Sequence, residues 1–263
     1  MRLRQRRARQ QAHGGRGDAE AVAHRRGRPG GLGLTPPLRL LSAGSTVRGL
    51  RALKGALEQR IGRTVEIATD HGHNIADAMG AGAAPAAAVL LPRGMIDALV
   101  DAGRLSPRTV DLGAVATSAV VSEGARAPDV STMDALRAAL AGASRVLLTT
   151  APSGEHMMRV IEGLGLADEL RAKIMRFDRS SEINEWLARA GDASALGFGP
   201  ETEIVGVEGV KHAGPIADEA QMVLPYAAAI TPEAARDGAA QAFLDFLGTD
   251  DARAAFKSTG VRF

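Results

Sequence analysis

The chain has 263 residues, 45% of them apolar and 24% charged, which is enough to bury a core in one large domain or two small ones. Only 3% of the residues are aromatic, which argues against the base-stacking surfaces of proteins that bind single-stranded nucleic acid. The absence of cysteine excludes disulfides, thiolate metal sites and a cysteine nucleophile. No apolar run approaches the ~20 residues of a membrane span, so we expect no membrane insertion.

The formal net charge of +2 is unevenly distributed along the chain. Residues 1–37 contain nine arginines against Asp18 and Glu20, so this segment carries +7 and the remainder −5. The segment is rich in Gly, Arg and Pro and has no apolar period, so we predict a disordered basic tail. A basic run can contact nucleic acid or an acidic membrane, but without an attached fold we interpret it as solvated and expect no nucleic-acid partner.

We expect no export signal in the chain as written. A signal peptide needs an apolar segment of roughly 7–15 residues after its basic start, and none precedes Leu38. Arg6 and Arg7 are followed by polar residues, which does not match a twin-arginine signal. An alternative hypothesis is that the start of the reading frame was misassigned and this tail replaces a genuine leader; N-terminal sequencing of the native protein would decide it.

Beyond Pro37, short apolar runs alternate with amphipathic stretches. Val47, Leu50, Leu53, Leu57 and Ile61 recur at helical spacing, directly after the apolar run "LRLLSA". The first part of the chain therefore predicts three strands, each followed by a helix. In chain order these are a strand at 38–43, a helix at 46–61, a strand at 64–69, a helix at 75–81, a strand at 86–92 and a helix at 94–102.

The second part opens on "LGAVATSAVVSEG", an apolar strand long enough to cross between two lobes. A capped helix begins at Ser131, and a strand at 145–149 leads through a Pro-Ser-Gly turn into another helix. "AKIMRF", "SEINEWLARAG" and "ALGFG" predict strand, helix and strand, "QMVLPYAAAIT" predicts a long strand, and the chain ends in helix, turn and helix. This alternation predicts an α/β protein with mostly parallel sheets.

Three short polar turns lie between a predicted strand and a predicted helix: "SAGST", "TDHGHN" and "TAPSGEH". In open α/β sheets, ligands bind at the carboxyl ends of the strands, where helix N-termini converge. Free N–H groups and the helix dipole favour an anion there. Any one of these turns could be only a helix cap, but three together predict a shared anion site.

From Leu38 to Phe263 the chain resembles the periplasmic solute-binding proteins of the molybdate-binding type, the receptors of ABC importers. The resemblance rests on "LLSAGSTVRGLRAL", "DHGHNIADAMGAGAAPAAAVLLPRGMIDALVDAGRL", "APSGEHMMRVIEGLGLADEL" and "AFLDFLGTDDARAAFKSTGV". Ala87 stands where the family usually has Asp in its "AG-x-PADV" segment. The closing pattern "FLxFLxxxxARxxFKxxG" is the most distinctive match.

The resemblance implies the type II periplasmic-binding fold: two α/β lobes with mostly parallel sheets flanked by helices, joined by two hinge-crossing strands. One lobe would comprise residues 38–116 and 232–263, and the other residues 117–231. The ligand would be a small anion held in the cleft without a metal or cofactor, and the lobes would close on it by hinge motion.

The resemblance also implies a set of ligand-binding residues. Ser45 matches the family's first-loop serine, and the second-loop serine falls at Gly72 or His73. The third turn would offer backbone donors, and the region of Ser180 and Ser181 would be a fourth contributor. The predicted ligand-binding residues are Ser45, Thr46, Gly72, His73, Asn74, Pro152, Ser153, Gly154, Ser181 and Phe198.

Two departures from the family weigh against molybdate as the ligand. The serine position in the second turn lacks a hydroxyl, and the family's ligand-contacting tyrosine falls near Phe198, which cannot donate a hydrogen bond. Each lost donor weakens an anion site by roughly 1.5–3 kcal/mol. The turns instead carry His71, His73 and His156, which suit a carboxylate and would make its binding dependent on pH.

The histidines also allow other interpretations. His71 and His73 could be solvated residues of a polar turn, and with Asp70 they supply three potential metal ligands, although loop spacing alone is weak evidence for a metal site. We expect no bound metal.

Some proteins similar to this part of the solute-binding family are organic-acid isomerases, such as aconitate isomerase. Their reaction requires one base and a set of groups that hold the anionic substrate. His71, His73, His156 and Glu155 are candidates for the base. Ser45 is not expected to be a nucleophile, because it lacks the G-x-S-x-G pattern. Effector domains of transcription factors share the fold, but the tail is too irregular for a helix-turn-helix.

The sequence therefore predicts a solute-binding protein that captures an organic carboxylate or oxyanion for an ABC permease, with an aconitate-isomerase-like enzyme as the alternative. By the resemblance, we expect a monomer located in the periplasm.

Overall fold

The computed structural model describes residues 35–82 and 86–263. Apart from its last three residues, the predicted disordered tail at 1–37 lies outside these ranges and stays a prediction.

The first group of elements follows the predicted order of strand and helix. Helix α1 buries Val47, Leu50, Leu53 and Leu57 along one face and ends at Gly62, whose φ of 65° is the left-handed conformation that glycine adopts easily. The elements are β1 (Leu38–Ala43), α1 (Gly44–Ile61), β2 (Val65–Asp70), α2 (Gly72–Gly80), β3 (Ala88–Pro92), α3 (Arg93–Asp101), β9 (Val223–Ile230), the 3-10 turn η3 (Ala234–Arg236), α8 (Gly238–Leu247) and α9 (Asp250–Ser258).

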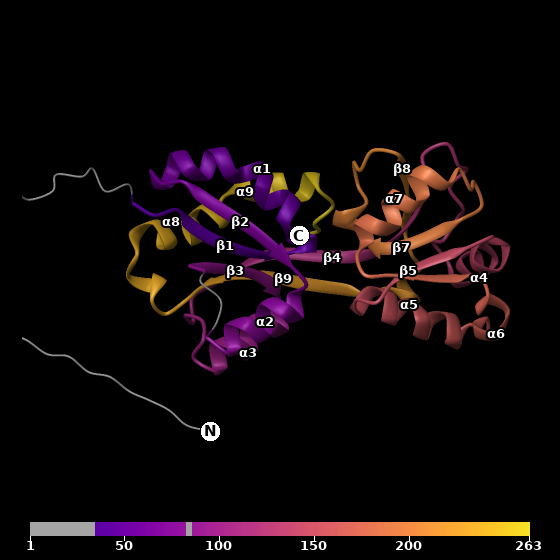
Figure 1. The fold of residues 1–263 in the computed structure, drawn as a ribbon, viewed down its shortest axis with the longest axis horizontal. Helices are drawn as coiled ribbons and strands as arrows, with labels where there is room; N and C mark the ends of the chain where they lie inside the picture. Colours follow the sequence, from indigo (N-terminus) through magenta and orange to yellow (C-terminus); the bar gives the residue numbers. More distant parts are fainter. Residues whose placement is uncertain (1–34, 83–85) are drawn as a thin grey trace, which may run out of the picture. The chain divides into compact units, whose positions relative to one another are not determined.

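The second group lies between them in sequence. It comprises β4 (Thr109–Ser122), α4 (Met133–Gly142), β5 (Val146–Thr149), α5 (Pro152–Gly163), α6 (Ala167–Leu170), β6 (Ile174–Phe177), α7 (Ser180–Ala190), β7 (Leu196–Pro200), the 3-10 turn η1 (Glu201–Glu203), β8 (Val210–Pro215) and the 3-10 turn η2 (Asp218–Ala220). Figure 1 shows β4 running from the first group of elements into the second.

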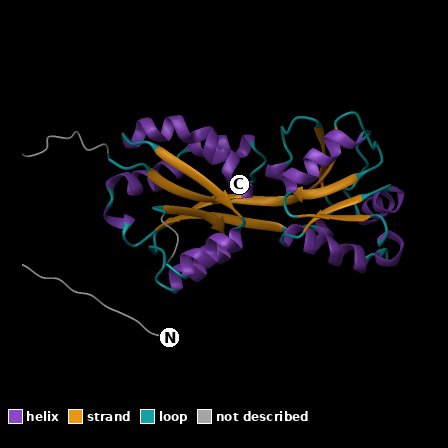
Figure 2. Ribbon diagram, viewed as in Figure 1, coloured by secondary structure: helices purple, strands orange, loops and turns teal. Residues whose placement is uncertain are grey.

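The strands form one mixed sheet in the order β2-β1-β3-β9-β4-β7-β5-β6, with β8 paired to β4. The outer strands of each group are parallel, as βα units require: β1 pairs with β2 and β3, and β5 pairs with β6 and β7. All pairings of β4 and β9 are antiparallel. The prediction of mostly parallel sheets therefore holds for the βα units and not for the strands that link them. Helices cover both faces of the strands (Figure 2).

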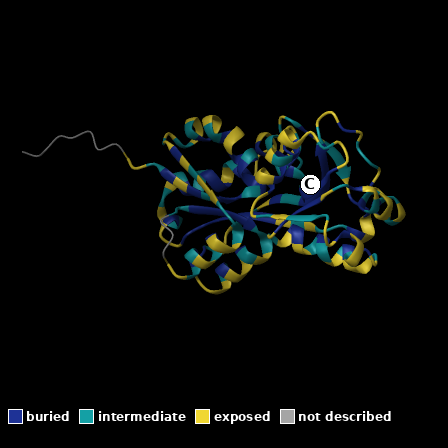
Figure 3. Cartoon of the chain, turned by 45° about the vertical axis from the view of Figure 1, so that its right-hand side comes forward, coloured by how far each residue is buried: buried dark blue, intermediate teal, exposed yellow. Residues whose placement is uncertain are grey.

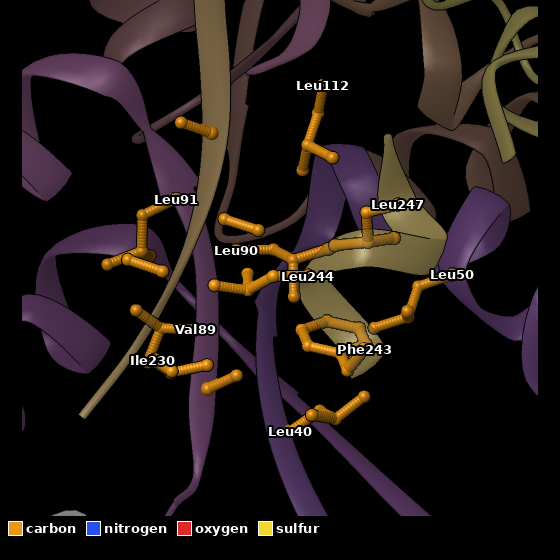
Figure 4. Packing of buried hydrophobic residues seen from close by; sticks show 14 of the residues in the cluster. Leu40, Leu50, Val89, Leu90, Leu91, Leu112, Ile230, Phe243, Leu244 and Leu247 are labelled. Atoms are coloured by element: carbon orange, nitrogen blue, oxygen red, sulfur yellow. The ribbon is translucent and has the colours of Figure 1, made fainter. Parts of the chain in front are cut away.

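The apolar core is divided between the two groups of elements. One apolar cluster joins α1, α8 and α9 to β1, β3 and β9, and Figure 4 shows Leu40, Leu90 and Phe243 meeting in it. Two further clusters, around Leu136 and Ile183, fill the second group. Buried residues follow the strands, and exposed residues lie on the outer surfaces of the helices (Figure 3).

Strand β4 changes partner within its length. It pairs with β9 up to Ala116 and with β7 from Thr117 onward. The side-chain amide of Gln221, just before β9, accepts from the Thr117 N–H at 2.7 Å and donates to the Thr117 carbonyl at 3.1 Å. The lobe boundaries at 116/117 and 231/232 remain our proposal. The change of partner supports the first boundary, whereas β9, which ends at Ile230, pairs with β3 and contributes to the first apolar cluster.

Several local predictions need correction. Helix α2 begins at Gly72 instead of Ile75, so half of the predicted polar turn is helical. Thr132, and not Ser131, caps α4, because its side chain accepts from the Ala135 N–H. Strand β8 was missed, since "VKHAGP" shows no apolar alternation.

No helix in the described ranges has both the length and the apolar character needed to cross a membrane.

Candidate functional site

A cavity of about 690 Å³ lies at the carboxyl ends of the parallel strands. Its wall includes the segments that follow β1, β2, β5, β6 and β7, together with the middle of β4 and the start of β9. This is where open α/β sheets bind ligands. Residues of both groups of elements line it, so a ligand here would touch both.

Among the helices that begin at this cavity, α1, α2, α5 and α7 have no side-chain cap. The residues preceding α1, α2, α5 and α7 are Ala43, His71, Ala151 and Arg179, and none accepts a capping hydrogen bond with its side chain. In contrast, α4, α8 and α9 are capped by threonine or aspartate side chains and begin elsewhere. Uncapped helix starts leave N–H groups and positive dipole ends facing the cavity, an arrangement that favours an anion.

Six of the ten predicted ligand-binding residues line the cavity. They are Ser45, Gly72, His73, Pro152, Ser153 and Ser181. The three predicted turns thus surround one space, and the start of α7 joins them. That these residues bind a ligand stays a prediction.

The other four predicted residues do not line the cavity. The Thr46 hydroxyl is buried and pairs with the Ser42 hydroxyl at 2.9 Å. The exposed Asn74 donates to the carboxylate of Asp70 at 3.1 Å. The Gly154 N–H donates within its own helix to the Ala151 carbonyl at 3.0 Å, so it is not free for an anion.

Gly154 has a packing role instead. A Cβ at this position would lie 1.9 Å from the Thr149 carbonyl oxygen, so only glycine allows α5 to start this close to the end of β5. Phe198, the fourth residue outside the cavity, is 1% exposed and belongs to a core cluster. It shares this cluster with Leu196, two residues earlier on β7, so its ring packs in the core and not in the cavity wall.

The expectation that the site lacks a phenolic hydroxyl is wrong. Tyr226 on β9, the one tyrosine of the chain, lines the cavity beside Ser45. The pKa of Tyr226 is raised to about 12, chiefly by burial and also by the nearby Glu203 carboxylate, while the hydrogen bond with the Ser45 hydroxyl acts in the opposite direction. The hydroxyl therefore stays protonated and can donate to a ligand.

We expect the phenol of Tyr226 to titrate near pH 12 in the folded protein, against about 10 in urea. A raised pKa means that its contribution to stability is complete below about pH 10 and is lost as the pH rises towards 12, by about 2–3 kcal/mol. The near-ultraviolet absorbance of phenolate measures this directly, because the chain has one tyrosine. Tyr226→Phe provides the blank. A midpoint near 10 in the folded protein would show that the hydroxyl is solvated.

Glu203, at the end of η1, is an acidic group on the cavity wall that the sequence-based predictions did not include. The Ser45 hydroxyl donates to its Oε1 at 2.9 Å, linking residues 158 positions apart. Burial raises the pKa of Glu203, against the hydroxyl bonds from Ser45 and Ser180 and the positive charges of His71 and Arg179. The net result is a carboxyl group that takes a proton more readily than an ordinary glutamate.

Two arginines of α1 face the cavity with different roles. Arg48 donates to the carbonyls of Thr202 and Val205 and so holds η1 against α1. Arg51, one turn further on, is exposed and forms no ion pair or hydrogen bond with the described part of the chain. Arg51 is therefore available to bind a ligand carboxylate.

Charged residues also meet across the cavity wall. The carboxylate of Asp178 lies 3.3 Å from His71 Nε2, and Arg179 lies 3.7 Å from both Asp70 and Asp178. The N–H of His71 holds the pKa of the Asp70 carboxyl below its usual range, with help from Asn74, His71 and Arg179. Asp70 thus stays ionised and is matched by Arg179.

The four residues predicted as candidate bases do not share one location. His71 and His73 line the cavity, with their rings stacked 5.5 Å apart. His156 lies outside it and contacts the Ala220 carbonyl through Nε2 at 2.6 Å, and Glu155 is paired with Arg176. An acid–base role is therefore open to the first two histidines and to Glu203.

Within residues 35–82 and 86–263, no group of three or more His, Asp or Glu side chains has an arrangement that could hold a metal ion.

The residues missed by sequence reasoning had weak signals. Glu203 follows a predicted strand, as the three turns do, but "GPETE" lacks the Ser and His residues that mark those turns. Arg48 and Arg51 follow Ser45 at three-residue steps, which places all three on one helix face. Tyr226 could have been noticed as the single tyrosine in an alanine-rich strand.

Comparison with known proteins agrees with this geometry. The model of the bacterial extracellular solute-binding protein family matches residues 38–262. The aconitate isomerase of a Pseudomonas species is 29% identical over 236 residues, which cover 86% of this chain and 87% of that protein.

Solved structures share the fold. The periplasmic molybdate-binding protein of Azotobacter vinelandii superimposes with a TM-score of 0.70 at 20% identity, covering 86% of this chain and 99% of its own. PEB3 of Campylobacter jejuni, solved with L-phospholactate bound, gives 0.64 at 13% identity, covering 86% and 99%. The predicted two-lobe periplasmic-binding fold is confirmed. Because the family model spans nearly all of the chain beyond the tail, the protein belongs to the bacterial extracellular solute-binding proteins.

Proposed function

We propose that the protein binds a small organic carboxylate in the cavity and delivers it to an ABC permease. The observation that carries the proposal is the convergence of four uncapped helix starts on one cavity of about 690 Å³, together with Arg51, which has no ion-pair partner in the described part of the chain. Helix starts and a guanidinium suit carboxylate oxygens, and the volume falls within the roughly 300–1,000 Å³ of sites for organic ligands.

The cavity also has an apolar side that a bare oxyanion would not need. Val47, Met95, Val115, Met222 and Leu224 contribute to its lining. Such side chains suit the carbon skeleton of an organic acid, while the polar groups fix its orientation. The relative named aconitate isomerase supports the same ligand class, since aconitate is a tricarboxylic acid.

A thermal-shift screen tests the proposal. Malate, citrate and tricarballylate are compared with molybdate, sulfate and phosphate, each at increasing concentration. A carboxylate at 100 times its dissociation constant should add about 2.7 kcal/mol to the free energy of unfolding. Stabilisation by the inorganic oxyanions alone would reverse the ligand assignment, and no stabilisation by any of these anions would refute the proposed function.

An isomerase of the aconitate type is the second candidate. It is favoured by the 29% identical relative and by Glu203, a carboxyl group with a raised pKa on the cavity wall. Such a reaction moves one proton between carbons of the bound acid, and Glu203, His71 or His73 would carry that proton. Incubation with cis- and trans-aconitate separates the two functions: a changing isomer ratio identifies an enzyme, and saturable binding without turnover identifies a receptor.

The surface supports action as a monomer. In the part of the chain that the structure describes, Val223 and Phe263 are the large apolar side chains that are mostly exposed, at 50% and 52%. Scattered exposed apolar residues do not form an association surface. We propose a monomeric receptor in the periplasm, whose two lobes, 38–116 with 232–263 and 117–231, close on the ligand.

A further inference from the structure

The carboxyl group of Glu203 lies beside the first turn of helix α1. Its Oε1 accepts from the Ser45 hydroxyl at 2.9 Å and lies 3.0 Å from where a Cβ of Gly44 would be. Gly44 is the first residue of α1, whose start lacks a side-chain cap. The start of α1 therefore already has an acidic group of the protein itself beside it.

Glu203 is held firmly in this position. Asn184 donates to the Glu203 carbonyl at 2.8 Å, and Arg48 donates to the carbonyls of Thr202 and Val205 on either side of it. The backbone of η1 is thus fixed from both α7 and α1. A ligand that reaches the start of α1 meets this carboxyl group and cannot easily displace it.

Among the residues that the structure describes, no cationic side chain lies within ion-pair distance of the Glu203 carboxyl group. Within the described residues it forms no salt bridge, and its hydrogen-bond donors are the hydroxyls of Ser45 and Ser180. The charged and titratable groups that face it are His71 at the start of α2, Arg179 before α7, Tyr226 on β9 and Arg48 on α1. The hydrogen bonds from Ser45 and Ser180, together with His71 and Arg179, lower the pKa of Glu203 less than burial raises it.

We infer that Glu203 takes up a proton when a carboxylate binds at the start of α1, so that the two carboxyl groups share one hydrogen bond. This inference rests on the proposed function. Two ionised carboxylates within hydrogen-bond distance repel each other strongly, so one of them takes up a proton and the two groups share it in a hydrogen bond. By linkage, the affinity for the carboxylate rises as the pH falls. Above the pKa of Glu203 in the ligand-free protein, the affinity decreases by up to about tenfold for each pH unit.

The test measures proton uptake directly. Tricarballylate, which has no double bond to isomerise, is titrated into the wild-type protein by calorimetry at about pH 8, where the ligand is ionised. Repeating the titration in Tris and in HEPES, whose ionisation enthalpies differ, gives the number of protons bound. We expect about one proton per ligand.

Glu203→Gln should bind tricarballylate without proton uptake and about tenfold or more tightly at this pH, because the amide donates as the protonated acid would. Glu208→Gln is the matched control, since Glu208 also lines the cavity but is exposed, and its uptake should equal that of wild type. The pH dependence of wild-type affinity provides a test that needs no variant.

The outcomes separate the two proposals. Wild-type binding without proton uptake, or uptake retained in Glu203→Gln, overturns the inference and leaves the proposed function intact; retained uptake would point to His71 or His73. If wild type binds none of the carboxylates, the proposed function falls and the inference falls with it.

Discussion

Replacing Phe256 by alanine is expected to lower the free energy of unfolding by about 3–5 kcal/mol, the range for large-to-small changes of a buried phenylalanine. Phe256 on α9 is 1% exposed and packs directly onto α1. A Cβ at Gly49 of α1 would lie 2.3 Å from its ring, so the ring fills the space that this glycine leaves. Without the ring, α1 loses its support along the turn that follows Ser45.

Equilibrium unfolding in urea, followed by circular dichroism, measures this effect. Ser258→Ala on the exposed side of the same helix is the control and should change stability by less than about 0.5 kcal/mol. Gly49→Ala should also destabilise the protein, because the added methyl group meets the phenylalanine ring. A loss below about 1 kcal/mol for Phe256→Ala would show that the contact between α9 and α1 contributes little.

Reversing the charge of Arg51 is expected to weaken carboxylate binding about 100-fold or more. Loss of a hydrogen bond to a charged group accounts for roughly 1.5–3 kcal/mol, and the new carboxylate adds repulsion of a few kcal/mol at an effective dielectric constant near 20. Arg51 lines the cavity and forms no ion pair within the described ranges, so no other contact should be disturbed.

Arg51→Glu is compared with Arg60→Glu, which makes the same charge change on the last turn of the same helix and away from the cavity. Arg60→Glu should leave the affinity within about threefold, since exposed charges beyond a Debye length of roughly 10 Å are screened by salt. Calorimetry or thermal shift with tricarballylate serves for both variants. Equal effects of the two variants would mean that net charge, and not contact with Arg51, governs binding.

The predicted strands and helices were largely confirmed because they depend on local periodicity. β1 was predicted within its observed bounds, and α1 begins two residues before its predicted start. Errors occurred where neighbours in space override local pattern. β8 has little apolar character and forms because β4 offers it an open edge. The start of α2 was missed because Gly72 and His73 have low helix propensity, which tertiary contacts with Met95 and Pro92 outweigh.

The candidate site was predicted in part. The three turns were found because each one follows a strand, and parallel strands bring their carboxyl ends to one edge. Phe198 was chosen by position in a resemblance, but its ring packs in a core cluster, while Tyr226 reaches the cavity from a strand distant in sequence. His156 and Glu155 were chosen for their chemistry, and their helix turns both of them away from the cavity wall.

The sequence by itself determined the alternation of strands and helices, the three polar turns and the family, because periodicity and motifs are properties of neighbouring residues. Only the tertiary structure decided what the turns face. Ser45 and Glu203 are 158 residues apart, and no local pattern connects them. Their hydrogen bond exists because β7 ends beside β4 and η1 is held against α1 by Arg48. Folding thus places the carboxyl group of Glu203 next to Ser45, in a turn where the local sequence predicts only that an anionic ligand binds.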